Sequence, residues 1–346
     1  MYRSSAGQGR TSASKVVAIG VAVVVFGLLS GCAEMNRGAA SPPKPRPMGA
    51  IDVHMHVVGT PSDKASDREK AFYLAPVEEK AQRLRQEMEK TGLAIVFLMG
   101  PVRSKVGLDD PLGVEENLRV AALAPGVKVV GAANPKGGLS EDFMAAVRRQ
   151  LQEHRKDIVA LKCYLGYQGG PEDPGYQPYY RLAEECNLPV IFHTGDTWPT
   201  TADVRLAHPL GVDRIATQHP KMRIVLAHVG VPWHLDAAEV AWKNNNVWLD
   251  LSGLLLADDQ SVGRMLKARS LPDVVPGLVL RDLRDALGYM NRYERLLYGT
   301  DGPVINCSMA NYRRFIEAVI PEEHHRKVFR DNAEKLFNVK AGQTGE

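Results

Sequence analysis

Apolar residues recur along the chain in short runs that alternate with longer amphipathic segments. Residues 93–99 form a continuous apolar run, which is typical of a parallel strand covered by helices on both faces. Segments such as 76–90 and 140–154 have helical periodicity, with a proline in the first turn or a serine at the cap. The alternation starts near residue 48 and continues to about residue 340.

The pattern predicts eight strands, at residues 50–57, 93–99, 127–133, 158–164, 189–194, 223–229, 247–252 and 296–300. Helices are expected at 76–90, 115–123, 140–154, 179–186, 204–218, 236–244, 262–268, 280–290, 309–320 and 322–337. Eight strands alternating with helices predict a single α/β domain at residues 48–340, a (β/α)8 TIM barrel. A doubly wound open sheet is the alternative, but no Gly-rich phosphate loop follows the first strand.

The first 31 residues do not belong to this domain. Three basic residues, Arg3, Arg10 and Lys15, precede an uncharged apolar run at 16–29. This run is short for a membrane span and typical of a signal-peptide core. The run ends in Leu29-Ser30-Gly31-Cys32, which resembles a bacterial lipobox. We expect a lipoprotein signal peptide at 1–31 and a lipid on Cys32; an uncleaved anchor and an ordinary secretory signal are the alternatives. Each of these places the protein outside the cytoplasm.

A tether rich in proline follows at residues 32–47. Its prolines favour an extended segment between the membrane and the domain. The three basic residues of the signal peptide account for the whole formal net charge of +3, so the mature chain is close to neutral. Nothing in this balance indicates nucleic-acid binding.

The predicted first strand carries a pattern that can bind metal. Strand alternation places Asp52, His54 and His56 on one face, and Ile51, Val53 and Met55 on the other, toward the helices. Two imidazoles at a strand end can reach one metal ion. By itself the pattern is equally that of an amphipathic strand that happens to contain two histidines.

Four other predicted strands end in titratable residues, namely Lys162, His193, His228 and Asp301. The carboxyl ends of the strands of a TIM barrel meet at one face, where the active sites of such enzymes lie. Burying several polar groups there without a shared partner would be costly. The sequence therefore predicts that these residues and the first strand form one site.

These segments resemble the amidohydrolase-related family (amidohydrolase 2) of metal-dependent hydrolases, which includes aminocarboxymuconate-semialdehyde decarboxylase. The matching segments are residues 52–56, 188–195, 224–230, 246–253, 298–301 and 331–337. The resemblance implies that His54, His56, His193 and Asp301 ligate one divalent metal ion and that His228 is a catalytic acid or base beside it. Imidazole and carboxylate ligands suit Zn²⁺, and a bound metal lowers the pKa of water to about 7. Asp301 could also accept the proton of that water, which makes it a second catalytic candidate.

Lys162 shares a strand face with Ala160 and Tyr164 and is expected to point into the barrel mouth. One hypothesis makes it a substrate-binding or ion-paired lysine. In the other, a carboxylated Lys162 bridges two metal ions, as in parts of the superfamily. Because the family that the chain resembles usually uses one metal, we favour the first hypothesis.

Loop residues supply further substrate-binding candidates. Arg103 follows the second strand and could bind a carboxylate, whereas Tyr164, Trp198 and Trp233 could line an apolar or aromatic pocket. The expected function is hydrolysis of an ester, lactone or amide of a small organic substrate. Non-oxidative decarboxylation and a non-catalytic surface binding lipoprotein are the alternatives. The expected partners are a small molecule, the membrane through Cys32, and a second copy in a homodimer.

Overall fold

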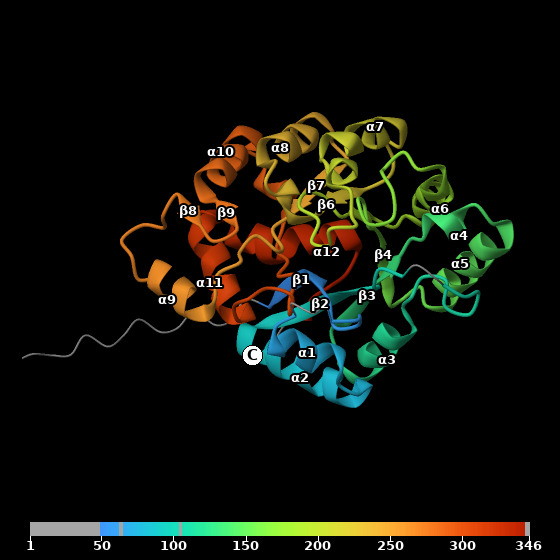
Figure 1. Ribbon diagram of the computed structural model, residues 1–346, viewed down its shortest axis with the longest axis horizontal. Helices are drawn as coiled ribbons and strands as arrows, with labels where there is room; N and C mark the ends of the chain where they lie inside the picture. The colour runs from blue at the N-terminus through green and yellow to red at the C-terminus, as the bar shows by residue number, and fades with distance from the viewer. Residues whose placement is uncertain (1–48, 62–64, 104–105, 343–346) are drawn as a thin grey trace, which may run out of the picture. The chain divides into compact units, whose positions relative to one another are not determined.

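Eight parallel strands form the central sheet in the computed structural model, which describes residues 49–61, 65–103 and 106–342 (Figure 1). Neighbouring strands are hydrogen-bonded in the order in which they occur along the chain. They are β1 (Ala50–Met55), β2 (Leu93–Met99), β3 (Val127–Ala132), β4 (Ile158–Cys163), β5 (Val190–Phe192), β6 (Ile224–Leu226), β7 (Val247–Asp250) and β10 (Leu296–Leu297).

Backbone hydrogen bonds also connect the first and the last strand. Val53 N–H donates to the carbonyl of Tyr298 over 3.0 Å, and Asp301 N–H donates to the carbonyl of His54 over 2.8 Å. His56 N–H donates to the carbonyl of Gly302 over 2.7 Å. The sheet is therefore a nearly closed barrel, and the predicted TIM-barrel fold is confirmed.

Helices surround the strands in Figure 1. Capping residues mark their ends. The Ser140 hydroxyl accepts a hydrogen bond from the Phe143 N–H at the start of the helix 141–153, and Gly92 ends the helix 77–91 with a φ of 64°. The helices are α1 (Asp67–Tyr73), α2 (Val77–Thr91), α3 (Glu115–Leu123), α4 (Pro135–Gly138), α5 (Glu141–Glu153), α6 (Gln177–Cys186), α7 (Leu210–Gln218), α8 (His234–Lys243), α9 (Asp259–Met265), α10 (Leu280–Met290), α11 (Met309–Val319) and α12 (Asn332–Phe337).

The structure corrects the predicted orientation of β1. Ile51 and Val53 belong to the apolar cluster inside the barrel, where they join Phe97 and the α12 residue Phe337. Asp52 lies between them in sequence and therefore faces away from the interior. A register irregularity between Asp52 and Met55 breaks the alternation and brings His54 to the inner side. The prediction that Asp52, His54 and His56 share one face is therefore wrong.

Most predicted elements agree with the structure, and β2 and α3 have the predicted bounds. The prediction missed α1, α4 and a short hairpin formed by β8 (Val274–Val275) and β9 (Leu278–Val279). Strand β6 is shorter than predicted because His228 and Val229 have φ angles of 61° and 45°, which are incompatible with a strand.

The predicted signal peptide at 1–31, the lipidated Cys32 and most of the tether at 32–47 lie outside the described residues. Across the described ranges, no helix combines the length and apolar character that a membrane crossing requires.

Gly195 gives a test of how the fold holds the loop after β5. Its φ is 100°, and an added Cβ would overlap the carbonyl oxygen of Val231. We expect Gly195→Ala to lower the free energy of unfolding by at least about 1–3 kcal/mol, measured by urea denaturation. Gly263→Ala is the control, because that helical position has open space around it and should gain about 0.5–1 kcal/mol. Equal stability of the two variants would contradict this account of the loop.

Candidate metal centre

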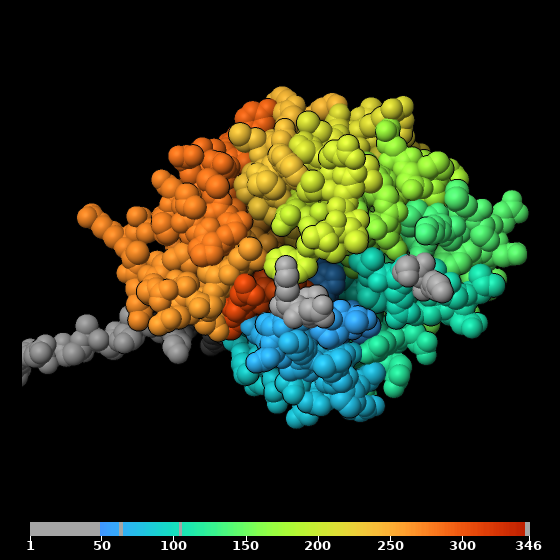
Figure 2. Space-filling model, in the orientation of Figure 1, coloured from blue at the N-terminus to red at the C-terminus, as the bar shows by residue number. Residues whose placement is uncertain are grey.

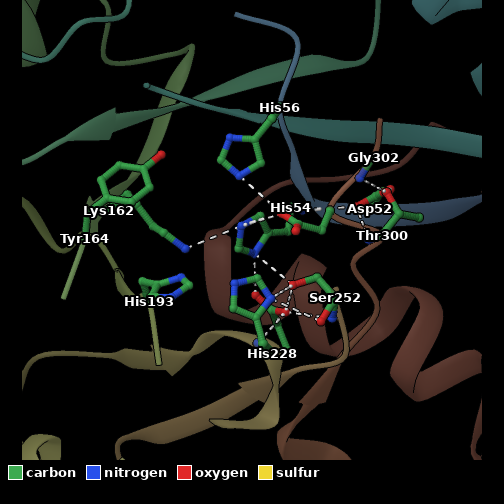
Figure 3. A network of polar contacts seen from close by, with 12 residues as sticks. Asp52, His54, His56, Lys162, Tyr164, His193, His228, Ser252, Thr300 and Gly302 are labelled. Carbon is green, nitrogen blue, oxygen red and sulfur yellow. Dashed lines mark hydrogen bonds and ion pairs between the residues drawn. The ribbon is translucent and has the colours of Figure 1, made fainter. Parts of the chain in front are cut away.

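The barrel brings His54, His228 and Asp301 together at the carboxyl ends of its strands. Figure 3 shows the rings of His54 and His228 next to each other in this group. One ligand atom from each of the three lies within 4.8 Å of the other two. Asp301 Oδ1 is 3.4 Å from His54 Nε2 and 3.2 Å from His56 Nε2. A carboxylate and three imidazoles are thus in place to hold a divalent metal ion.

His193 borders this group. Its ring centre lies 5.0 Å from that of His228, and its Nε2 donates a hydrogen bond to the carbonyl of Asp196 over 2.8 Å. Its Nδ1 therefore carries the lone pair. The structure places all four predicted ligands in one region, and it places His228 within the tight group of three.

The free nitrogen atoms of the imidazoles fit a metal site. His54 Nδ1 is 2.8 Å from Asp250 Oδ2, and His228 Nδ1 is 3.1 Å from the carbonyl oxygen of Ser252. Both of these acceptors require a proton on Nδ1, so each Nε2 keeps its lone pair. Hydrogen bonds of this kind orient histidine ligands in metalloproteins.

Burial keeps the imidazoles neutral. It lowers the pKa of His54 to about 3, with the nearby positive charge of Lys162 acting in the same direction. Burial also lowers the pKa values of His193 and His228. Neutral imidazole is the form that binds metal.

Asp301 stays ionised in the same surroundings. Burial would raise its pKa, but a hydrogen bond from His56 and the electrostatic influence of the nearby His228 and His54 hold it well below the usual range. Its φ of 65° lies in the left-handed region, as does that of His228. Such strained backbone is concentrated at functional sites.

Asp250 and Ser252 are site residues to which the sequence analysis gave no role. Both are fully buried, and the Ser252 hydroxyl contacts Asp250, His54 and His228. Burial would raise the pKa of Asp250, but its electrostatic interaction and its hydrogen bond with His54 lower it. Their segment, 246–253, was noted for its family resemblance, and the alternation of β7 was the signal that could have placed both side chains toward the site.

Lys162 reaches the same centre from β4. Its Nζ lies 3.4 Å from His54 Nε2, and burial lowers the pKa of its ammonium group to about 8. Among the described residues, no carboxylate lies within ion-pair distance of this ammonium group. Tyr164 is also buried, but its hydroxyl donates to the carbonyl of Gly100 over 2.5 Å and is not free for a substrate.

The other substrate candidates lie farther out. The Arg103 guanidinium is 3.4 Å from Asp110, and Trp198 is 59% exposed. The ring of Trp233 packs against His208, with 4.6 Å between their centres. Tyr167, which the sequence analysis did not consider, packs edge-on against His193 with 4.9 Å between centres. Figure 2 shows the surface hollowed near the middle of this face, between the blue segment around α1 and the yellow-green segment after β5.

A protein-family model described as Amidohydrolase matches residues 51–339. The chain therefore belongs to the amidohydrolase family, whose members are mostly metal-dependent enzymes, and the predicted resemblance is confirmed. A search of the curated proteins gives no match.

Solved structures agree with the fold. A TIM-barrel protein from Bordetella bronchiseptica superimposes with a TM-score of 0.55 at 19% identity, covering 84% of this chain and 98% of that one. A protein assigned as a 2-pyrone-4,6-dicarboxylic acid hydrolase from Pseudomonas putida gives 0.55 at 18% identity, with the same coverage. A D-hydantoinase from a Thermus species gives 0.52 at 17% identity, covering 84% and 70%. At these identities the similarity concerns the fold alone.

Metal binding to this cluster can be measured through stability. Zn²⁺ should raise the melting temperature of the wild-type protein, because a ligand that binds only the folded state stabilises it. Asp301→Ala should abolish most of this increase, since the carboxylate contacts two of the imidazoles. His219→Ala is the control, because that imidazole pairs with Glu184 outside the cluster and should keep the full increase. An undiminished zinc-dependent shift in Asp301→Ala would place the metal elsewhere.

Proposed function

We propose that this protein is a metal-dependent hydrolase that cleaves an ester, lactone or amide bond of a small organic substrate. The observation that carries the proposal is the group formed by His54, His228 and Asp301, in which neutral imidazoles face an ionised carboxylate. Membership of the amidohydrolase family supports the same chemistry.

His54, His56, His193 and Asp301 would hold one divalent ion, for which Zn²⁺ is our first choice. When bound, this ion would act as a Lewis acid and lower the pKa of water to about 7. His54 and Asp301 belong both to this predicted set and to the tight group of three. They are therefore the two ligands for which the geometry gives the strongest support.

The residues of the chain supply the proton transfers. Asp301 is ionised and can accept a proton from the attacking water. His228 has its Nδ1 fixed by Ser252, so its free Nε2 can take up that proton and deliver it to the leaving group. Because burial lowers the pKa of His228, the residue is a base at neutral pH.

Lys162 is proposed to bind substrate. Within the described part of the chain, the hydrogen-bond partner of its ammonium group is His54 Nε2. A metal ion bound to that nitrogen would leave the ammonium group free to face a substrate at the barrel mouth. There it can donate a hydrogen bond to a substrate carbonyl or carboxylate oxygen.

The competing hypothesis for Lys162 is a carbamate that bridges two metal ions. We expect metal analysis to find one ion per chain, and intact-mass spectrometry under bicarbonate to show no added carboxylate. Lys162→Met should then raise KM with the metal content unchanged. Two ions per chain together with a mass increase that Lys162→Met removes would overturn the single-metal proposal.

We also propose that the mature protein is anchored by a lipid on Cys32 outside the cytoplasm. The support is the sequence of residues 1–32 alone. Metabolic labelling with a fatty acid tests this, because unlabelled protein would contradict it. An extracytoplasmic location suits an enzyme that hydrolyses scavenged substrates.

The reaction can be tested with a panel of esters, lactones, amides and arenecarboxylates. We expect hydrolysis without CO₂ release, loss of activity on chelation, and recovery when Zn²⁺ is added back. Asp301→Asn should lower kcat by about 10²–10⁴-fold, the contribution typical of a general acid or base. CO₂ release without hydrolysis would replace the proposal by a decarboxylase. Absence of any turnover by metal-loaded protein would favour a binding lipoprotein.

A further inference from the structure

The carboxylate of Asp250 contacts two histidines of the metal centre, the ring of His54 and the backbone of His228. Its Oδ2 is 2.8 Å from His54 Nδ1. Its Oδ1 accepts the backbone N–H of Ser252 over 2.8 Å, the Ser252 hydroxyl, and the backbone N–H of His228 over 3.3 Å. All four groups are buried, so no solvent competes for these hydrogen bonds.

We propose that Asp250 is a positioning residue that fixes the tautomer of His54 and thereby makes His54 Nε2 a ligand. A carboxylate only accepts hydrogen bonds, so it requires a proton on Nδ1. On the other edge of the ring, the Lys162 ammonium group lies 3.4 Å from Nε2 and only donates. Both neighbours therefore select the same tautomer. This inference rests on the proposed metal-dependent function.

Ser252 extends the arrangement to His228. Its hydroxyl donates to Asp250 Oδ1 and lies 3.0 Å from His228 Nδ1, so it accepts there. Its carbonyl oxygen is 3.1 Å from the same nitrogen. The same hydroxyl oxygen also lies 3.0 Å from His54 Nδ1, so each of the two Nδ1 protons has two acceptors. For His54 the nearer of the two is Asp250 Oδ2, at 2.8 Å.

The short contact between Asp250 Oδ2 and His54 Nδ1 makes Asp250→Asn informative. Three donors surround the Oδ1 position, so the amide oxygen of an asparagine must take that place. Its NH₂ group then faces His54 Nδ1 in place of Oδ2. When the imidazole accepts from that NH₂, its proton lies on Nε2 and blocks the nitrogen that faces Asp301.

The test is ¹⁵N NMR of histidine-labelled, metal-free protein, together with zinc titration. The wild type should show His54 protonated at Nδ1, and Asp250→Asn should show it protonated at Nε2 with about 10–100-fold weaker zinc binding. Asp52→Asn is the matched control: this carboxylate is equally buried, but its hydrogen bond to His54 goes to the backbone N–H and not to the imidazole ring. Ser252→Ala should keep the His54 tautomer, because Asp250 Oδ2 remains.

A wild-type His54 protonated at Nε2 would overturn the inference, and this measurement decides even if Asp250→Asn does not fold. An Asp250→Asn protein that keeps Nδ1–H and wild-type zinc affinity would also overturn it. Since the tautomer is read without metal or substrate, it is independent of whether the protein hydrolyses anything. Failure of the hydrolase proposal and failure of this inference are therefore distinguishable.

Discussion

The contact between the first and the last strand determines where the site can form. Where these two strands meet, the Asp301 N–H donates to the carbonyl of His54. The hydrogen bonds that close the barrel therefore also place the Asp301 carboxylate beside the His54 imidazole. On the outer side of the barrel, Asp52 stabilises the same contact between the strands by accepting hydrogen bonds from the backbone N–H and the hydroxyl of Thr300. Burial raises the pKa of Asp52 to about 7 even though it accepts these hydrogen bonds.

The polar centre inside this barrel is stable only because its groups satisfy one another. Asp250 supplies acceptors for imidazole, hydroxyl and backbone donors, and burial keeps His54 neutral. Lys162 is the exception, since its one polar partner among the described residues is the nitrogen proposed as a metal ligand. A buried ammonium group without a carboxylate is costly, so a function in binding substrate gives it a physical reason to be there.

Much of this arrangement could be predicted from the sequence. The apolar run of β2 and the periodicity of α3 gave their bounds, and the titratable residues at strand ends were recognised because the barrel brings such ends together. The orientation of β1 could not be predicted, because the irregularity after Asp52 has no signature in a pattern of alternating residues. The left-handed backbone of Val229 was equally hidden, since β-branched residues rarely adopt it.

Asp250 and Ser252 were missed for a different reason. Polar residues at a strand end are common, and their importance here comes from hydrogen bonds to His54 and His228, which are far away in sequence. A side chain's tautomer depends on such partners and cannot be seen in the sequence of its own strand.

The central claim is that a metal ion binds between His54 and Asp301. Anomalous X-ray diffraction from crystals of the protein grown with Zn²⁺ tests it most directly. We expect one strong peak in contact with His54 Nε2 and a carboxylate oxygen of Asp301. A peak elsewhere in the protein, or none at this position in zinc-saturated crystals, would contradict it.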